Sequence, residues 1–403
     1  MINAEISRLI SSGSTIRRIW ADGQRLKKAH GAENVADVTL GNPLTAPPTE
    51  VTCALEDLVR NPPSDLHYYT ANAGHPAARE QIAAHLQETG LLPQVQAKHV
   101  VLTCGASAAI NVILRAILDS GDEVMILAPF YPDYPVHIAN YGCVPIVVST
   151  DEHSLPDLEA IAAALSSRTR ALIINHPNNP SGRQYPESRL RELAEILHEH
   201  GRKNGHPVVL ISDEPYRGLR YTDEPYVSPA KLYDHGVMVY TFSKSHAIPG
   251  ARIGYIAVNP AFPEVERTVE GFALANRILG FTSAPALWQR VVARCQSAVI
   301  DLTNYHRHRR RLIEVLQAKG YRVDPPEGGF YLFPKVPGDD NEFCRRAMDD
   351  LLLIVPGSTF GSPGHIRIAF CVDDHTIDLV HIRLPHLTEA ESFPYSTAKR
   401  PRP

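Results

Sequence analysis

The sequence predicts an α/β protein with a large domain, whose mostly parallel sheet is covered by helices, and a smaller α+β domain. Three observations support this prediction: short apolar runs recur between about residues 75 and 260, helix-length amphipathic segments separate several of them, and a mixed α+β stretch follows. Apolar strands that alternate with helices are typical of βαβ units, whose parallel strands are buried on both faces.

Seven apolar runs are expected to form the buried strands. They lie at 99–104, 123–128, 144–149, 170–175, 207–212, 237–242 and 252–258. Among the segments between them, 186–200 is the clearest amphipathic helix, because its leucines and isoleucine fall on one face. Gly201 follows this helix and supplies a stop signal.

The same patterns suggest how the chain divides. A helix is expected from Ser14 to His30 and another over 286–320, where apolar residues recur at helical spacing. The expected division is an N-terminal arm that joins the small domain (1–45), a large domain (46–285), the rest of the small domain (286–387) and a polar, disordered tail (388–403).

Charge and cysteine usage favour a cytoplasmic protein. The 40 basic and 44 acidic side chains give a net charge of −4, so there is no electrostatic reason to expect nucleic acid or an anionic membrane. No apolar run reaches the roughly 20 residues that span a bilayer, and no signal peptide is visible. The six cysteines form no C-x-x-C pair, so no metal site is expected. The basic run 307–311 is interpreted as a solvated helix face.

The densest group of reactive side chains follows the strand at 237–242. Lys244 is expected at the carboxyl edge of the sheet, where open α/β sheets build ligand sites. The hydroxyls of Thr241 and Ser243 and the cation of Arg252 are suited to holding a phosphate. Taken alone, a lysine at a strand end is more often structural or exposed to solvent.

Three further strands end in polar segments. Residues 213–216 (Asp-Glu-Pro-Tyr) end one strand, 178–182 (Asn-Asn-Pro-Ser-Gly) follow another, and 103–107 (Thr-Cys-Gly-Ala-Ser) join a third to a helix. The last arrangement points backbone N–H groups at an anion. Four such segments, all at the carboxyl ends of strands, are difficult to explain by packing alone and indicate a binding site.

These segments resemble those of fold-type I aminotransferases that use pyridoxal 5′-phosphate (PLP), a class that includes aspartate, aromatic and kynurenine aminotransferases and 1-aminocyclopropane-carboxylate synthases. The similarity runs from about residue 38 to about residue 371, and the run 243–254 (Ser-Lys-Ser-His-Ala-Ile-Pro-Gly-Ala-Arg-Ile-Gly) resembles the family's lysine signature closely. The resemblance implies an aspartate-aminotransferase-like fold with a seven-stranded sheet, and an activity that moves an amino group from an amino acid to a 2-oxo acid.

The resemblance also implies a role for each residue around the cofactor ring. Lys244 would hold PLP as a Schiff base and move the substrate's α-proton, and Asp213 would pair with the pyridine nitrogen. Tyr216 and Asn179 would hydrogen-bond the 3′ oxygen, and Tyr131 would stack on the ring. Lys244, Asp213 and Tyr216 are therefore the expected catalytic residues.

Two anionic groups would be held at the ends of the site. The residues implied for the phosphate are Ala106, Ser107, Thr241, Ser243 and Arg252, together with Tyr69 from the neighbouring subunit of a homodimer. The residues implied for the substrate's α-carboxylate are Arg367, Asn179 and the backbone of Gly41.

Elementary chemistry agrees with three of these roles. The PLP ring withdraws electrons only while its nitrogen stays protonated, and a buried carboxylate such as Asp213 raises the pKa of a neighbouring cation. Lys244 must be neutral to act as a base, which partial burial favours. Arg367 interrupts an apolar strand-like run, so its guanidinium needs an anionic partner, and its planar fork matches a carboxylate.

The sequence leaves several alternatives open. Fold-type I enzymes also carry out β- or γ-elimination, replacement, cyclisation and oxidase reactions with the same residues around PLP. A non-catalytic regulator is disfavoured, because only about 40 residues precede the first motif. His176 and His246 are expected to support the site and not to react. The side-chain specificity stays undecided, with Arg17, Arg18 and Arg277 as the only candidates to bind a second carboxylate.

Overall fold

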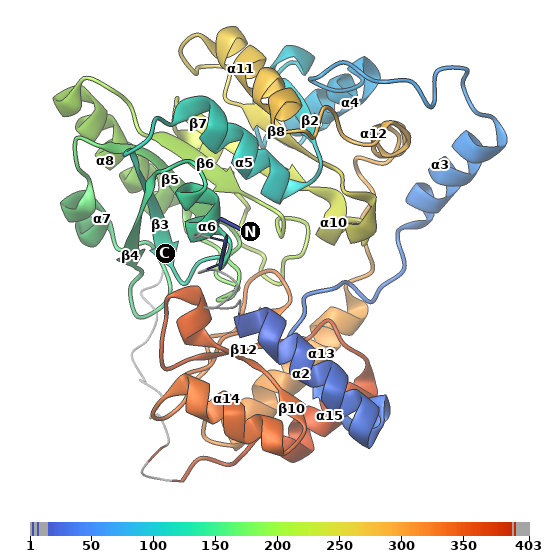
Figure 1. Ribbon diagram of the computed structural model, residues 1–403, viewed down its shortest axis with the longest axis vertical. Coiled ribbons are helices and arrows are strands. Elements are labelled where there is room, and N and C mark those ends of the chain that lie inside the picture. Colours follow the sequence, from blue (N-terminus) through green and yellow to red (C-terminus); the bar gives the residue numbers. More distant parts are fainter. Residues whose placement is uncertain (1, 4–5, 8–14, 389–390, 392–403) are drawn as a thin grey trace.

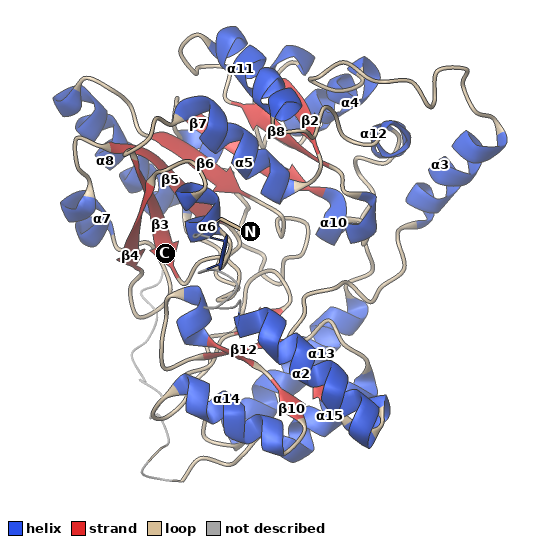
Figure 2. Ribbon diagram, viewed as in Figure 1, coloured by secondary structure: helices blue, strands red, loops and turns tan. Residues whose placement is uncertain are grey.

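The computed structural model describes residues 2–3, 6–7, 15–388 and 391, and it has two parts that lie one above the other in Figures 1 and 2. The upper part contains the large sheet, and the lower part contains α2, α13, α14 and α15 around two small sheets. The tail expected to be disordered lies outside the described residues, apart from Thr388 and Glu391. No helix in the described part of the chain is long and apolar enough to cross a membrane.

The large sheet has seven strands and is mostly parallel, which confirms the expected fold class. Its spatial order is β2 (Val100–Thr103), β8 (Gly254–Val258), β7 (Gly236–Thr241), β6 (Val209–Asp213), β5 (Thr169–Asn175), β3 (Glu123–Ala128) and β4 (Val144–Ser149). Only β8 runs antiparallel to its neighbours β2 and β7. The carboxyl ends of the other six strands therefore meet at one edge, which is where the polar segments were expected.

Helices cover both faces of this sheet, because the middle residues of its central strands are apolar on both sides. In β5, Ala171 and Ile173 enter one core, whereas Leu172 and Ile174 enter the core on the opposite face. The helices of this part are α3 (Thr49–Arg60), α4 (Pro76–Glu88), α5 (Ala106–Ile117), α6 (Tyr134–Ala139), α7 (Leu158–Ala164), α8 (Glu187–Asn204), α9 (Pro229–Leu232), α10 (Phe242–Ser245), α11 (Val265–Ile278) and α12 (Ala286–Ala293).

The predicted helix at 186–200 is α8, but its stop signal was assigned wrongly. The helix continues through Gly201 and ends at Asn204. Gly205 follows in the left-handed conformation, with φ 72°, and its N–H donates to the carbonyl O of Gly201. A glycine adopts that conformation at little steric cost, so the second of the two glycines ends the helix.

The lower part combines an early segment of the chain with a late one. Its elements are α2 (Thr15–His30), β1 (Ala36–Asp37), α13 (Thr303–Ala318), β9 (Tyr331–Leu332), α14 (Asp340–Asp349), β10 (Leu352–Leu353), β11 (Val355–Pro356), β12 (Ile366–Ala369) and α15 (Asp374–Arg383). The strand β1 pairs parallel with β10, and β12 lies between β11 and β9 in an antiparallel sheet. Val38, Leu312 and Ile368 share one core, so residues that follow the N-terminal helix complete this part.

The single helix expected over 286–320 is wrong, because a loop separates α12 from α13. The helix α12 packs on α3 and α4, and its Val291 and Val292 belong to a core of the upper part. Ile300, in the loop, enters the lower core, so the apolar pattern continues through the break and hides it. We therefore place the division between the domains in this loop and not at residue 285.

Gly254, at the start of β8, lies against the backbone of β7 and of the turn at Gly105. A Cβ at Gly254 would overlap the carbonyl O of Tyr240 and lie 3.0 Å from the Cα of Gly105. Gly254→Ala is expected to lower the free energy of unfolding by about 1–3 kcal/mol, because β7 and the turn at Gly105 must move. In Gly271→Ala the new Cβ would meet nothing within 4 Å, and α11 should gain up to about 1 kcal/mol. Urea denaturation measures both, and equal stability of the two variants would contradict the prediction.

Candidate active site

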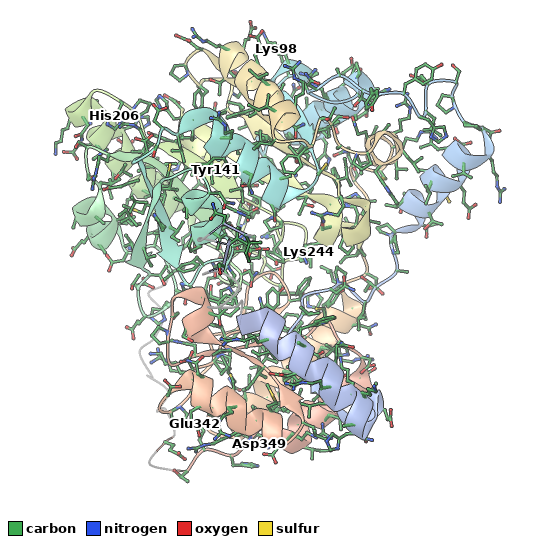
Figure 3. The ribbon with its side chains drawn as sticks, in the orientation of Figure 1. Lys98, Tyr141, His206, Lys244, Glu342 and Asp349 are labelled. Carbon is green, nitrogen blue, oxygen red and sulfur yellow. The ribbon has the colours of Figure 1, made fainter. Side chains whose placement is uncertain are left out.

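A cavity of about 420 Å³ lies at the carboxyl edge of the large sheet, where the two parts of the molecule meet. Figure 3 shows Lys244 in this position. The predicted site residues on the cavity wall are Gly41, Ala106, Ser107, Tyr131, Asn179, Asp213, Tyr216, Thr241, Ser243, Lys244, Arg252 and Arg367. Tyr69 is the exception, because its side chain is 93% exposed and does not line the cavity of its own chain.

Lys244 is placed by a short helix, α10, which begins directly after β7. Its Nζ donates a hydrogen bond of 2.6 Å to the carbonyl O of Gly41 and lies 5.2 Å from the centre of the Phe330 ring. Burial lowers the pKa of Lys244 to about 8, and the nearby cations of Arg367 and Arg252 also lower it. The neutral amine, which is the form that acts as a nucleophile or a base, is therefore more accessible than in an exposed lysine.

Asp213 is the last residue of β6 and is buried. Its Oδ2 accepts a hydrogen bond of 2.5 Å from the hydroxyl of Tyr134 and a longer one, 3.5 Å, from the amide of Asn175. Its Oδ1 is also buried and has no hydrogen-bond partner among the described residues. Burial raises the pKa of Asp213 to about 7, and the donation from Tyr134 opposes that rise. A cationic N–H pointed at Oδ1 would satisfy the carboxylate.

The opposite end of the cavity is suited to an anion. Gly105 has φ 89° and precedes α5, whose N-terminal residue Ala106 lines the cavity. A Cβ at Gly105 would lie 2.8 Å from the guanidinium of Arg252, so only glycine leaves this space open. The hydroxyls of Thr241 and Ser243 lie 2.8 Å apart on the same wall. A helix N-terminus, a cation and two hydroxyls together form a typical phosphate site.

Arg367 lies in β12 and is 4% exposed. Its guanidinium donates to the Oδ1 of Asn179 (3.2 Å) and to the carbonyl O of Thr39 (2.5 Å), and it lies 4.4 Å from the centre of the Tyr331 ring. Its Nε is buried without a hydrogen-bond partner in the part of the chain described. All of these contacts are neutral, so the buried cation is ready for an anion such as a carboxylate.

Aromatic residues shape the rest of the cavity. The rings of Tyr216 and Tyr331 pack edge to face with their centres 6.1 Å apart, and Tyr131 donates its hydroxyl to the Oδ2 of Asp133 (2.8 Å). A Cβ at Gly41 would overlap the Tyr331 hydroxyl, so the close approach of these two residues requires glycine. Tyr331 and Gly41 therefore form a closely packed part of the cavity wall next to Lys244.

The two histidines that flank the motifs have structural surroundings. His176 is stacked between Tyr185 and Tyr226, at ring distances of 5.2 and 4.8 Å, and burial lowers its pKa to about 3. His246 hydrogen-bonds the carbonyl O of Cys295 (2.8 Å), and burial lowers its pKa to about 4. Neither is among the residues that line the cavity, which agrees with the expected supporting role.

The remaining arginines singled out in the sequence lie elsewhere. Arg18 and Arg277 are exposed and do not line the cavity, and the side chain of Arg17 is outside the described part. In the basic run, Arg307 pairs with Asp374 (2.7 Å) and Arg311 pairs with Asp378. The run was expected to be a solvated helix face. Arg307 and Arg310 are exposed, whereas His308 is buried.

Among the residues at the site that received no role from the sequence, four make polar or ring contacts with residues that did: Thr39, Tyr134, Asn175 and Tyr331. Asn175 and Tyr134 were detectable in principle, because each lies in or beside a strand-end segment that carries other site residues. Tyr331 follows Phe330 and resembles a core aromatic in sequence, and Thr39 contributes only its backbone, which no side-chain pattern reveals.

Tyr134→Phe tests the hydrogen bond to Asp213. Loss of a donor to a carboxylate is expected to raise the pKa of Asp213 further above its value of about 7, by roughly one pH unit or more, because the anion loses a charge-assisted hydrogen bond. Infrared spectroscopy of the cofactor-free protein with labelled aspartate reports this pKa. Tyr185→Phe, which changes a buried tyrosine outside the cavity, should leave it unaltered, and an unchanged value in Tyr134→Phe would refute the assignment.

Comparison with known proteins identifies the family. The model of the aminotransferases of class I and II matches residues 33–383. The aspartate aminotransferase of Thermotoga maritima is 31% identical over 372 residues, which cover 91% of this chain and 94% of that protein. A probable aspartate/prephenate aminotransferase of Aquifex aeolicus is 31% identical over 328 residues, which cover 77% of this chain and 80% of that protein.

Solved structures share the fold along almost the whole chain. An amino transferase from Eubacterium rectale has a TM-score of 0.90 at 34% identity, and the match covers 95% of this chain and 97% of that one. A single mutant of the aspartate aminotransferase of Thermus thermophilus has a TM-score of 0.84 at 26% identity, with 95% and 98% covered. These relatives favour transamination over elimination, replacement, cyclisation and oxidation. The chain belongs to the class I and II aminotransferase family and is an aminotransferase with the fold of type I.

Proposed function

We propose that the protein is a PLP-dependent aminotransferase that exchanges the amino group of an amino acid with a 2-oxo acid in the cavity around Lys244. The supporting observation is the arrangement of that cavity. A partly buried lysine and a carboxylate that has one oxygen without a partner line the same cavity, and each of two anion sites contains one arginine. A molecule that carries a carbonyl, a basic ring nitrogen and a phosphate satisfies the lysine, the carboxylate and one of the anion sites together.

PLP fits the residues that are present. When bound, it supplies an electron sink that stabilises negative charge at the substrate's α-carbon. The amine of Lys244 would hold it covalently, the Oδ1 of Asp213 would accept from its ring nitrogen, and the N-terminus of α5 with Arg252 would bind its phosphate. The remaining residues that would contact it are Ser107, Tyr131, Asn179, Tyr216, Thr241 and Ser243.

The substrate is held by its α-carboxylate. The guanidinium of Arg367 offers its unpartnered Nε edge, and Asn179 is already fixed beside it by their hydrogen bond. Gly41 links this anchor to Lys244, because its carbonyl O accepts from Nζ and its backbone lies against Tyr331. A carboxylate held here directs the α-carbon toward the amine of Lys244.

Lys244 then moves the proton at that carbon. Its free amine is neutral over more of the physiological pH range than that of an exposed lysine, because burial and two arginines lower the pKa of Lys244 to about 8. The amine of Lys244 would take the proton from the substrate's α-carbon and would later return it. PLP, when bound, would supply the carrier for the amino group between the amino acid and the 2-oxo acid.

We also propose that the protein forms a homodimer and is located in the cytoplasm. We infer a homodimer, because Tyr69 is 93% exposed and lines no cavity of its own chain, although the family resemblance gives it a role at a phosphate. The cysteines of the described chain form no disulfide, which supports a reducing, cytoplasmic location. Aspartate and prephenate occur in the names of relatives, and we leave the side-chain class of the donor to experiment.

Lys244→Ala tests the function directly. Turnover is expected to fall by more than about 10²–10⁴-fold, since both the covalent attachment and the proton transfer are lost. Amino acids and 2-oxo acids are supplied in pairs, and the products and oxygen uptake are measured. Lys98→Ala, which removes an exposed lysine paired with Glu266, serves as the control and should retain activity. Near-normal turnover of Lys244→Ala would exclude the proposed site, and oxygen consumption by the unaltered protein would indicate an oxidase.

Arg367→Lys tests the carboxylate anchor. The charge is kept but the planar fork is lost, so the apparent dissociation constant for amino acids is expected to rise substantially. In Arg367→Ala the rise should be about 30-fold to several thousand-fold, which corresponds to about 2–5 kcal/mol for a desolvated charge pair. Titrations are run with an amino acid and with the matching amine that lacks the carboxylate. If both ligands are weakened equally, Arg367 is a structural cation and not the anchor.

A further inference from the structure

The segment between α3 and α4 presents two tyrosines to the outside. Tyr68 is 68% exposed and Tyr69 is 93% exposed, although large aromatic side chains are usually buried in a single chain. Neither lines the cavity of its own chain. Exposed aromatic side chains on a well-held segment are typical of a surface that binds another molecule.

The backbone after Tyr69 is held by one buried glutamine. Gln289 of α12 is 0% exposed, and its Nε2 donates to the Oγ1 of Thr70 (3.0 Å) and to the carbonyl O of Ala284 (2.5 Å). Its Oε1 accepts from the backbone N–H of His75 (2.6 Å). Every donor and acceptor used here is internal, so loss of this amide would leave polar groups buried without partners.

The next residue of the same helix holds the other side of the segment. Arg290, 8% exposed, pairs with Asp65 at 2.7 Å, and the carbonyl O of Asp65 accepts from the N–H of Tyr68. Gln289 and Arg290 therefore fix the chain before and after the exposed pair.

A second helix fixes the turn that follows. Asn276 of α11 is 0% exposed and donates to the carbonyl oxygens of Asn72 and Leu102, at 3.3 Å each. Gly74 has φ +104°, and a Cβ there would lie 2.5 Å from the Leu102 side chain, so the turn lies against β2. Internal contacts therefore hold the chain on both sides of the two tyrosines, so a partner that binds them has less conformational entropy to remove.

We propose that Gln289, supported by Arg290, is a positioning residue that acts in trans: it fixes the segment that presents Tyr69 to the phosphate end of the cavity in a second copy of this chain. This inference rests on the proposed function and its homodimer. Two observations support a second copy as the partner. Arg252 is exposed, so the phosphate end of the cavity is open at the surface, and α11 beside the segment exposes Leu274 and Ile278 by 49% and 55%.

Hybrid dimers with one usable cavity test the direction of this effect. Two differently tagged chains are co-expressed and purified through both tags, and Lys244→Ala inactivates one cavity. When Gln289→Leu is placed in the same chain as Lys244→Ala, the usable cavity receives its Tyr69 from the altered chain, and turnover should fall about 10-fold or more. When Gln289→Leu is placed in the other chain, the usable cavity receives an intact segment and should keep the turnover of a hybrid that carries Lys244→Ala alone.

Two further variants keep the test decisive. Thr70→Val removes only the hydroxyl that Gln289 contacts, and it should give the same pattern if Gln289→Leu does not fold. Gln296→Leu is the matched control, because the Nε2 of Gln296 donates to the carbonyl O of Val292 within its own region and not to the segment. It should have no effect in either arrangement.

A binding measurement gives a readout that does not depend on turnover. In the Gln289→Leu homodimer the dissociation constant for PLP should rise about 10-fold, whereas that for pyridoxal, which lacks the phosphate, should stay unchanged. Equal loss in the two hybrids, loss only when the change lies in the chain that supplies Lys244, or equal loss for both cofactors would overturn the inference. An unaltered protein that transaminates as a monomer would overturn it as well and would leave the proposed reaction standing, whereas an unaltered protein without transamination would refute the function itself.

Discussion

The burial of Asp213 at the end of β6 is the constraint on which the rest of the site depends. One oxygen of its carboxylate is held by Tyr134, and the other is buried and has no partner among the described residues. A buried carboxylate in this state is costly, and burial accordingly raises its pKa to about 7. Asp213 is also among the residues that line the cavity, so a cationic N–H of a bound ligand would offset this cost. The carboxylate therefore favours a ligand with a protonated nitrogen, as in the proposed binding of PLP.

The two cations of the cavity have neutral partners. Arg367 is buried and Lys244 is partly buried. Both are hydrogen-bonded to carbonyl oxygens, with a side-chain amide as a further partner of Arg367 and no carboxylate in the bonds they make. Had either been neutralised by an aspartate or glutamate, the amine would stay protonated or the guanidinium would be occupied. The neutral partners hold the cations in position without neutralising them, so both cations can pair with anionic groups of a ligand. The site is preorganised in this respect.

Much of this arrangement could be predicted from the sequence, because parallel strands place their carboxyl ends together. Asp213, Asn179, Ser107 and Lys244 were assigned to one site from their positions after apolar runs, and all four line the cavity. Tyr331 was missed, because its partners Gly41 and Arg367 come from distant segments and its neighbours make it resemble a core residue. The break between α12 and α13 was missed for a related reason. Val292 and Ile300 are both buried but in different cores, and a periodic pattern does not say which core a residue enters.

The buried polar atoms of the cavity that lack hydrogen-bond partners also link ligand binding to the stability of the fold. The pKa of Asp213 is higher in the folded chain than its ordinary value of 3.8, so its contribution to the stability of the cofactor-free protein is fully present below about pH 4 and is lost as the pH rises through about 7. Above that pH the folded protein carries a buried anion that the unfolded chain does not. A cation at Oδ1 reverses the sign, because it stabilises the charged carboxylate only in the folded state. The buried carboxylate that suits the site to a cationic ligand therefore lowers the stability of the protein at neutral pH, and binding of such a ligand would offset that loss.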